Sequence, residues 1–355
     1  SEVLGREKKG LTVGTNTFKA LWKRFINDSD FKEARYKRFK LVYKNYLSWF
    51  NNYDIAEIRQ ETITNWVNFR LDAGYERNKR PVSATTISGE VAMLKQVLRY
   101  GVAKSLLQVL PTFNAELNKI KSDKITFKKR RGGAIDDRTA TKIMDILYEN
   151  MVKPTNVHRY KWSRQLLYYY IVVCNEAGLR PGTEATTLRW RDLYTEQTSK
   201  GMFQYFKVAG KREAADARRD KRVAILAFTG MEPLWKWKEL CDKQGFYGPD
   251  EYIFRDHIGQ QVDQRNLNRS FRKLLKKAGL YAVNGKAITL YSWRSNRINK
   301  LLNNPELTLA EVARLSGTSL RTIQSEYYDQ RQLLSGGTGY ARAAGTASIV
   351  PKDGQ

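Results

Sequence analysis

A pair of arginines and a pair of adjacent tyrosines are the residues of this chain whose types best suit chemistry on a phosphate. Arg180 lies in AGLRPGTEATTLRWRDL, residues 177–193, where one helix is expected to end at Gly178 and another to begin after Pro181. Arg180 would project from this junction, and Glu184, one turn into the second helix, would hold its guanidinium. An arginine at a helix junction is more often a surface salt bridge, so this position alone assigns no function.

The tyrosines Tyr327 and Tyr328 end the stretch SGTSLRTIQSEYY. On a helix that begins near residue 319, Leu320, Ile323 and Tyr327 share one face, which is the pattern of packed core residues. A phenol, with a pKa of about 10, is a poor nucleophile unless nearby cations favour the phenolate. The stretch by itself therefore leaves open whether either tyrosine reacts or packs.

A second arginine, Arg294, stands in the helical segment YSWRSNRINKLLNN. Attack on a phosphodiester builds negative charge on its non-bridging oxygens, and a guanidinium offers such oxygens two parallel hydrogen bonds. Arg180 and Arg294 together would neutralise that negative charge. In the same segment Trp293 is expected to pack in the core, with contact to a base or sugar as the alternative. Arg297 is expected to form a surface ion pair, with membership of the phosphate-binding cluster as the alternative.

GLRPGTE followed by LRWRDL resembles the first active-site box of the tyrosine recombinase (phage integrase) family, and the family's later boxes follow in order. Lys211, after an apparent strand, stands where a β-hairpin lysine belongs. YSWR, residues 291–294, stands where His-x-x-Arg is usual. GTS, residues 317–319, replaces a glycine followed by His or Trp, and nine residues after Thr318 comes Tyr327.

This count favours Tyr327 over Tyr328 as the nucleophile, and the boxes span about 150 residues in the family's order. A subset of phage integrases carries the same YSxR and GTS variants. With Glu184 in a supporting role, the catalytic set that the resemblance implies is Arg180, Lys211, Tyr291, Arg294, Thr318 and Tyr327.

The resemblance also implies a reaction. Tyr327 would form a 3′-phosphotyrosyl link, Lys211 would protonate the leaving 5′-oxygen, and neither ATP nor a metal or other cofactor would be required. Tyr291 and Thr318 take positions that commonly hold imidazole, and their hydroxyls can donate hydrogen bonds but cannot act as bases near neutral pH. The chain's two histidines, His158 and His257, are expected to be structural or surface residues.

The charge of the chain predicts a polyanionic partner. Its 355 residues include 63 Lys and Arg against 36 Asp and Glu, for a net charge of +27. Double-stranded DNA is the favoured partner, because such charge releases counterions from a nucleic acid. An anionic membrane surface is the competing interpretation, but no basic amphipathic helix, lipidation motif, signal segment or membrane span supports it. The two widely spaced cysteines favour a reducing compartment, hence the cytoplasm. The family resemblance implies association with the nucleoid of a prokaryotic host.

The predicted fold is mainly α with a small β-sheet. A helical core DNA-binding domain, 1–116, would be joined by a basic linker, 117–135, to a mixed α/β catalytic domain, 136–331, and a tail, 332–355. The linker segment KIKSDKITFKKRRGG is either a solvated connection or a strap on the DNA backbone. The DNA-contacting residues are expected to include Lys95, Arg99, Lys128, Lys129, Arg130 and Arg131.

Local patterns predict individual elements. In the first domain a helix in ETITNWVNFRLDAG is expected to stop at Gly74, and another to follow Ser83. In the second domain MFQYFKVAG and KRVAILA predict a β-hairpin pair. The helices expected there lie in DDRTATKIMDILYEN, RQLLYYYIVVCNEAG, RNLNRSFRKLLKKAG, YSWRSNRINKLLNN and LTLAEVARLSG.

The family resemblance implies a C-clamp around the duplex and a homo-tetramer that exchanges strands through a Holliday junction, with an accessory directionality factor as a further partner. Two alternatives stay open. LTLAEVARLSGTSLRTIQSEYY also fits a helix-turn-helix, as in a DNA-binding regulator. The other alternative is a degenerate recombinase that binds its sites without cutting them. The replacement of the usual histidines favours it.

Overall fold

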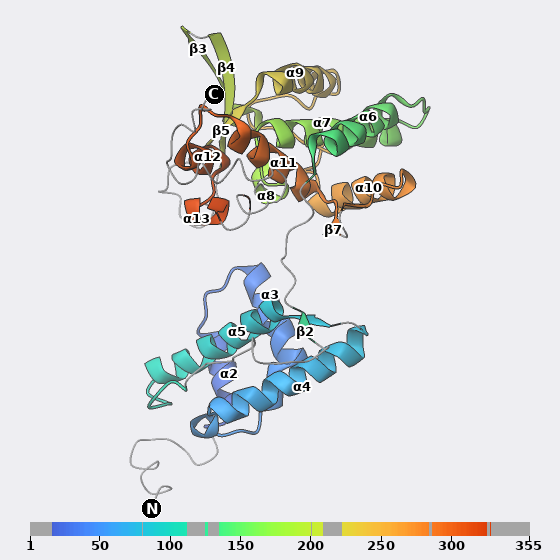
Figure 1. Ribbon diagram of the computed structural model, residues 1–355. Coiled ribbons are helices and arrows are strands. Elements are labelled where there is room, and N and C mark those ends of the chain that lie inside the picture. Colours follow the sequence, from blue (N-terminus) through green and yellow to red (C-terminus); the bar gives the residue numbers. More distant parts are fainter. Residues whose placement is uncertain are drawn as a thin grey trace, which may run out of the picture. The chain divides into compact units, whose positions relative to one another are not determined.

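The computed structural model divides into two compact units, Ser1–Arg130 and Arg131–Gln355, drawn in Figure 1. The predicted linker spans this division, and all but three of its residues lie outside the part of the chain that the structure describes, so the predicted domain boundaries stay a prediction. The structure describes residues 16–79, 81–111, 125–126, 135–199, 201–208, 222–283, 286–324 and 327.

The first unit is a helical bundle around an aromatic core. Phe18, Phe50 and Trp66 are fully buried, and the ring centroids of Phe50 lie 5.4 Å from Phe18 and 5.8 Å from Trp66. The short strands β1 (Val82–Ser83) and β2 (Ile125–Thr126) pair in parallel. The helical elements are α2 (Phe18–Asn27), α3 (Glu33–Asn45), η1 (Leu47–Phe50), η2 (Ile55–Glu57), α4 (Gln60–Asn78) and α5 (Ala84–Ala103).

Helix α4 does not stop at Gly74, as the sequence predicted, but continues for a further turn to Asn78. Gly74 is needed for close packing rather than for a helix end. A Cβ placed there would lie 2.3 Å from Nη1 of Arg70 and 2.6 Å from Cγ2 of Val82. The glycine therefore makes room for a buried arginine.

That arginine forms a buried ion pair that was not predicted from the sequence. Nε and Nη2 of Arg70 donate to the two carboxylate oxygens of Glu90, at 2.6 and 2.9 Å, and both side chains are about 5% exposed. The guanidinium carbon also lies 3.6 Å from the centroid of the Tyr46 ring. This fork-to-fork geometry ties α4 to α5 inside the core.

The second unit combines an antiparallel sheet with a cluster of helices (Figure 1). Its sheet has the order β3 (Leu193–Thr198), β4 (Gly201–Val208), β5 (Arg222–Leu226), with Leu193 opposite Phe206 and Gln204 opposite Leu226. A two-stranded hairpin, β6 (Ala282–Val283) and β7 (Lys286–Ala287), lies apart from it. The helical elements are α6 (Asp137–Val152), α7 (His158–Glu176), α8 (Thr183–Thr186), η4 (Trp190–Asp192), α9 (Phe228–Lys243), α10 (Gln264–Lys277), α11 (Leu290–Asn303), α12 (Leu309–Ser316) and α13 (Leu320–Ile323).

Helix α7 is the centre of this unit and packs against α6, α9 and α11. Its Tyr170 is fully buried, as are Phe206 of β4 and Trp237 of α9. Trp293 is 1% exposed in the same core, as predicted. A separate apolar cluster joins α11, α12 and the segment after α13: Ile298, Leu302, Val312, Ala313, Ile323 and Tyr327.

The predicted fold class, mainly α with a small sheet, is confirmed. The five helices expected in the second domain are present, and the strands of the predicted hairpin pair as β4 and β5. Strand β3 and helix α9 were not predicted. In the part of the chain that the structure describes, no helix has the length and apolar character that would take it across a bilayer.

Breaking the buried pair of the first unit should be costly. The variant Glu90→Gln leaves the Arg70 charge buried without its counter-charge, so we expect the free energy of unfolding to fall by about 3–5 kcal/mol. Urea titration followed by tryptophan fluorescence measures this. Glu33→Gln is the control, because Glu33 pairs with Lys37 at 2.5 Å on the exposed surface and its loss should change little. Equal, small effects of the two variants would contradict the prediction.

Candidate active site

The junction between α7 and α8 positions Arg180. Helix α7 ends at Glu176, and Gly178 adopts a left-handed φ of +61°, so that the Leu179 N–H donates to the Cys174 carbonyl at 3.0 Å. Leu179 is fully buried, which anchors the chain directly before Arg180. The predicted break between two helices is therefore present, with the turn one residue beyond the end of α7.

Glu184 holds Arg180 by two contacts. Its Oε2 accepts from the Arg180 backbone N–H at 2.5 Å, and its Oε1 accepts from Arg180 Nη1 at 3.0 Å. Glu184 lies on α8 and is about 5% exposed, whereas Arg180 is 27% exposed. The carboxylate thus fixes both the backbone and the guanidinium, and leaves Arg180 open to solvent.

A third arginine, Arg222, shares this carboxylate. Arg222 begins β5, and its Nε donates to Glu184 Oε1 at 2.8 Å. Its side chain is 12% exposed. Sequence analysis did not single it out, because it stands beside the other cations of RRDKR and carries no motif of its own.

The three arginines meet at the C-terminal end of α12. There, three consecutive backbone carbonyls each accept a hydrogen bond from a different guanidinium. Such carbonyls have no partner within their own helix and carry the negative end of its dipole, so cations stabilise them. The pairs are Arg222 with Leu315, at 3.3 Å, Arg294 with Ser316, and Arg180 with Gly317.

Arg294 is the most deeply placed of these side chains, with 1% of its surface exposed. Its Nη1 also donates to the Gly178 carbonyl at 2.5 Å, so it joins α11 to the α7 turn as well as to α12. Burial, followed by the charges of Arg180 and Arg222, lowers the pKa of Arg294 to about 10. Arg294 therefore remains a cation at neutral pH.

Gly317 is required where these side chains meet. It adopts a left-handed φ of +59° as the C-cap of α12. A Cβ there would lie 2.2 Å from Cδ of Arg222. The glycine of the GTS box thus serves both the turn and the close approach of an arginine.

The replaced histidine positions flank this arginine cluster. Tyr291 lies half-buried in the first turn of α11. It is close enough to Arg294 to raise the pKa of this guanidinium, in opposition to burial and to the charges of the other two arginines. Thr318 directly follows Gly317, and its N–H donates to the Ala313 carbonyl at 3.0 Å. The structure therefore brings four predicted residues and Glu184 together around the end of α12: Arg180, Tyr291, Arg294 and Thr318.

Tyr327 packs in the apolar cluster beside α12 and is 3% exposed, along with the fully buried Ile323. Leu320, which the helical pattern placed on the same face, is instead 42% exposed, so that part of the prediction is wrong. Leu320 and Ile323 both lie in the short helix α13, which buries Ile323 and leaves Leu320 exposed, so the three residues do not share one buried face. Tyr328 and Lys211 lie outside the described residues.

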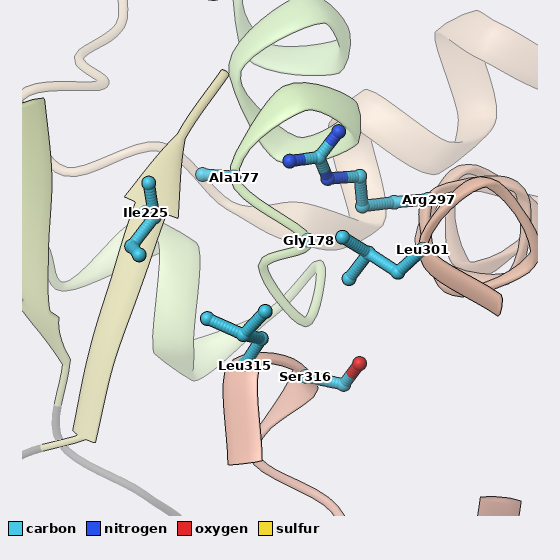
Figure 2. Close-up of a pocket in the computed structure, with 7 residues that line it drawn as sticks. All are labelled: Ala177, Gly178, Ile225, Arg297, Leu301, Leu315 and Ser316. Carbon is cyan, nitrogen blue, oxygen red and sulfur yellow. The ribbon is translucent and has the colours of Figure 1, made fainter. Parts of the chain in front are cut away.

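Arg297 does not form the expected surface pair. It is half-buried, burial lowers its pKa, and no described residue forms a hydrogen bond or an ion pair with it. It lines a small pocket of about 80 Å³ that opens beside the arginine cluster (Figure 2). The other residues that line this pocket come from the α7 turn, β5, α11 and α12: Ala177, Gly178, Ile225, Leu301, Leu315 and Ser316.

The remaining predicted residues lie elsewhere. Lys95 and Arg99 are on α5 in the first unit, Lys95 half-buried and Arg99 exposed. His158 begins α7 and stacks on Trp162, as a structural residue does. Among the described residues, no group of three His, Cys, Asp or Glu side chains could hold a metal ion. The basic linker residues fall outside the described ranges: Lys128, Lys129, Arg130 and Arg131.

Loss of the Glu184 charge should destabilise the protein in a pH-dependent way. Burial raises the pKa of Glu184, but the hydrogen bond and charge of Arg222, together with Arg180, lower it below its ordinary value. Its contribution is therefore present above the ordinary carboxyl pKa and lost as the pH falls through the lower, folded-state value. We expect Glu184→Gln to cost about 3 kcal/mol at neutral pH, with the deficit shrinking in acid.

Thermal denaturation of both proteins between neutral and acid pH measures this difference. Glu232→Gln is the control, because Glu232 also has a pKa lowered by a cation, Lys236, but lies exposed on α9. A deficit of Glu184→Gln that stays constant across the range would show that its charge does not contribute as described.

No protein-family model and no curated protein matches this sequence, but solved structures share its fold. A lambda integrase (75–356) dimer bound to a COC′ core site is 15% identical, with a TM-score of 0.60 over 88% of this chain and 95% of that one. The Tn1549 transposon integrase (82–397) in complex with circular intermediate DNA is 13% identical, with a TM-score of 0.61 over 90% and 99%. A lambda integrase tetramer bound to a Holliday junction is 14% identical, with a TM-score of 0.58 over 88% and 77%. The resemblance to the tyrosine recombinases therefore holds at the level of the fold, and this chain has the fold of those integrases.

Proposed function

We propose that this protein is a site-specific tyrosine recombinase, an integrase that cleaves and rejoins double-stranded DNA through a 3′-phosphotyrosyl intermediate. The observation that carries the proposal is the convergence of Arg180 and Arg294 on the end of α12, next to Tyr291 and Thr318. Residues far apart in the sequence meet there in the set that the family resemblance implied. The shared fold with DNA-bound integrases supports the same function.

Each of these side chains has a separate role in the proposed reaction. The Tyr327 hydroxyl gives up its proton to water, and its oxygen attacks the phosphorus and displaces the 5′-oxygen, which takes a proton from Lys211. Arg180 and Arg294 neutralise the charge that develops on the non-bridging oxygens. Attack by a 5′-hydroxyl of another strand then reverses the step, and the covalent link conserves the energy of the broken bond, so the reaction needs neither ATP nor a metal.

Helix α12 contacts both the arginines and the apolar cluster that contains the proposed nucleophile. Its terminal carbonyls accept from the arginines, while its Val312 and Ala313 pack in the cluster that contains Tyr327. Tyr291 and Thr318 would donate hydrogen bonds to the phosphate, because neither hydroxyl can serve as a base near neutral pH. Glu184 would keep Arg180 in position.

The proposal extends to the assembly. The net charge of +27 suits duplex DNA, with Lys95, Arg99 and the basic linker residues as backbone contacts. The solved relatives in fold are bound to DNA, one of them as a tetramer on a Holliday junction. By analogy we propose a C-clamp on the duplex, a homo-tetramer on paired sites in the cytoplasm, and a directionality factor as accessory partner.

A second candidate is a protein that binds recombination sites without cleaving them. The specific observation in its favour is that Tyr291 and Thr318 occupy the two positions where imidazole is usual. A helix-turn-helix regulator is less well supported, because it gives no reason for three arginines to converge on the end of α12.

Trapping the covalent intermediate distinguishes these candidates. Duplexes enriched for binding from a random-sequence pool, each nicked at successive positions, would be incubated with the protein and separated under denaturing conditions. A nick lets the short 5′-hydroxyl fragment diffuse away, so that the adduct accumulates. We expect an adduct with the wild type, none with Tyr327→Phe, and undiminished adduct with the matched control Tyr328→Phe.

Loss of the adduct only with Tyr328→Phe would keep the function and move the nucleophile by one residue. Tight, sequence-specific binding without an adduct at any nick position would contradict cleavage and favour the second candidate.

A further inference from the structure

We propose that Arg222 is a positioning residue of this site, which holds Glu184 and the end of α12 so that Arg180 can bind a phosphate. This inference rests on the proposed function wherever DNA cleavage is the quantity measured. No box of the family resemblance includes this position, and the structure alone brings it forward.

Arg222 bridges the two parts that fix Arg180. Its Nε donates to Glu184 Oε1 at 2.8 Å, and its Nη1 donates to the Leu315 carbonyl at 3.3 Å. Arg180 contacts the same Glu184 oxygen, at 3.0 Å, and the carbonyl two residues beyond Leu315. Arg222 on β5 is therefore bonded to the carboxylate that holds Arg180 and to the end of α12, where Arg180 is also bonded.

Arg222 is bonded to the carboxylate that also holds Arg180, which assigns it a supporting role beside a more exposed arginine. Its side chain is 12% exposed, against 27% for Arg180. Two of its donors are bonded to protein groups, and Nη2 is buried without a partner among the described residues. A phosphate on DNA would reach Arg180 more readily than it would reach Arg222.

The charge of Arg222 also matters to Arg180. A carboxylate beside one guanidinium forms a neutral pair, which attracts an anion weakly. Because Glu184 Oε1 is shared by two guanidiniums, the trio of Arg180, Glu184 and Arg222 keeps a net positive charge. Glu184 can thus fix the orientation of Arg180 without cancelling the charge of the site.

The turn after α12 is shaped around this arginine. The missing side chain of Gly317 leaves the space that Cδ and Nε of Arg222 fill, since an added Cβ would lie 2.2 and 2.5 Å from them. Thr318 follows in the chain. Arg222 consequently packs against the residue that directly precedes Thr318, a second member of the proposed catalytic set.

The test compares Arg222→Met, which keeps an unbranched side chain, with Arg222→Lys, Glu184→Gln and the double variant Arg222→Met/Glu184→Gln. The control is Arg265→Met, which removes an exposed arginine paired with Asp263 in the same unit. Two quantities are measured on nicked DNA: Kd, and the single-turnover rate of adduct formation at saturating protein.

We expect Arg222→Met to slow adduct formation on the order of 100-fold, as misplacement of a catalytic group does, with little change in Kd. Arg222→Lys should be intermediate, because an ammonium supplies the charge without the planar fork. In the Glu184→Gln background, Arg222→Met should have a smaller effect than in the wild type, because the part of its action that passes through Glu184 is already lost. An unchanged rate per folded molecule, with only a lowered Tm, would show a merely structural residue and overturn the inference.

A second measurement does not depend on cleavage. Sulfate serves as the phosphate probe, and its effect on Tm is compared with that of chloride at equal ionic strength. We expect sulfate to stabilise the wild type and Arg265→Met more than it stabilises Arg180→Met or Arg222→Met. If the wild type forms no adduct, the proposed function fails while this comparison still decides the inference. A sulfate response retained in full by Arg222→Met, or absent from the wild type, would overturn it.

Discussion

The end of helix α12 organises the second unit. Its last carbonyls accept hydrogen bonds from three guanidiniums that arrive from the α7–α8 junction, from β5 and from α11. A helix of eight residues leaves half of its carbonyls without internal partners, and the three arginines satisfy those closest to its C-terminal end. These contacts also join the strand, the helices and the turn that surround the site. Because each arginine bonds to a rigid backbone, its guanidinium is positioned before any ligand arrives, which is the arrangement that electrostatic catalysis requires.

Three cations around one carboxylate are unfavourable for stability, which indicates a function for them. Burial and the neighbouring guanidiniums depress the pKa of Arg294 to about 10, and Glu184 is the one acid whose contacts offset this repulsion within the described cluster. The buried pair of Arg70 with Glu90 in the first unit is different, because its charges balance and both groups are sealed from water. A cluster that keeps excess positive charge, with Arg180 partly exposed, is suited to an anionic substrate.

The fold class and most helices could be predicted from the sequence, because they depend on periodicity. The resemblance of short motifs to a known family led to the expectation of five further residues around the site: Arg180, Glu184, Tyr291, Arg294 and Thr318. Arg222 could not be predicted in this way, since its partners Glu184 and Leu315 are 38 and 93 positions distant. Gly74 was misinterpreted as a helix end for a related reason: only the packed structure shows that it clears space for Arg70. Leu320 was placed on a buried face by the helical pattern, but it lies exposed in α13 while Ile323 of the same helix is buried, because the pattern does not say which side of so short a helix other elements cover.

In the proposed site Arg180 and Arg294 bind one phosphate, while Arg222 and Glu184 hold Arg180 in place. A crystal structure of the Tyr327→Phe variant, bound to a duplex selected by the protein, would show whether they do. We expect a single phosphate whose non-bridging oxygens accept hydrogen bonds from Arg180 and Arg294, with Arg222 still bonded to Glu184 and Leu315. DNA bound with no phosphate at the end of α12, or with Arg222 released from Glu184 to take the phosphate itself, would contradict this expectation.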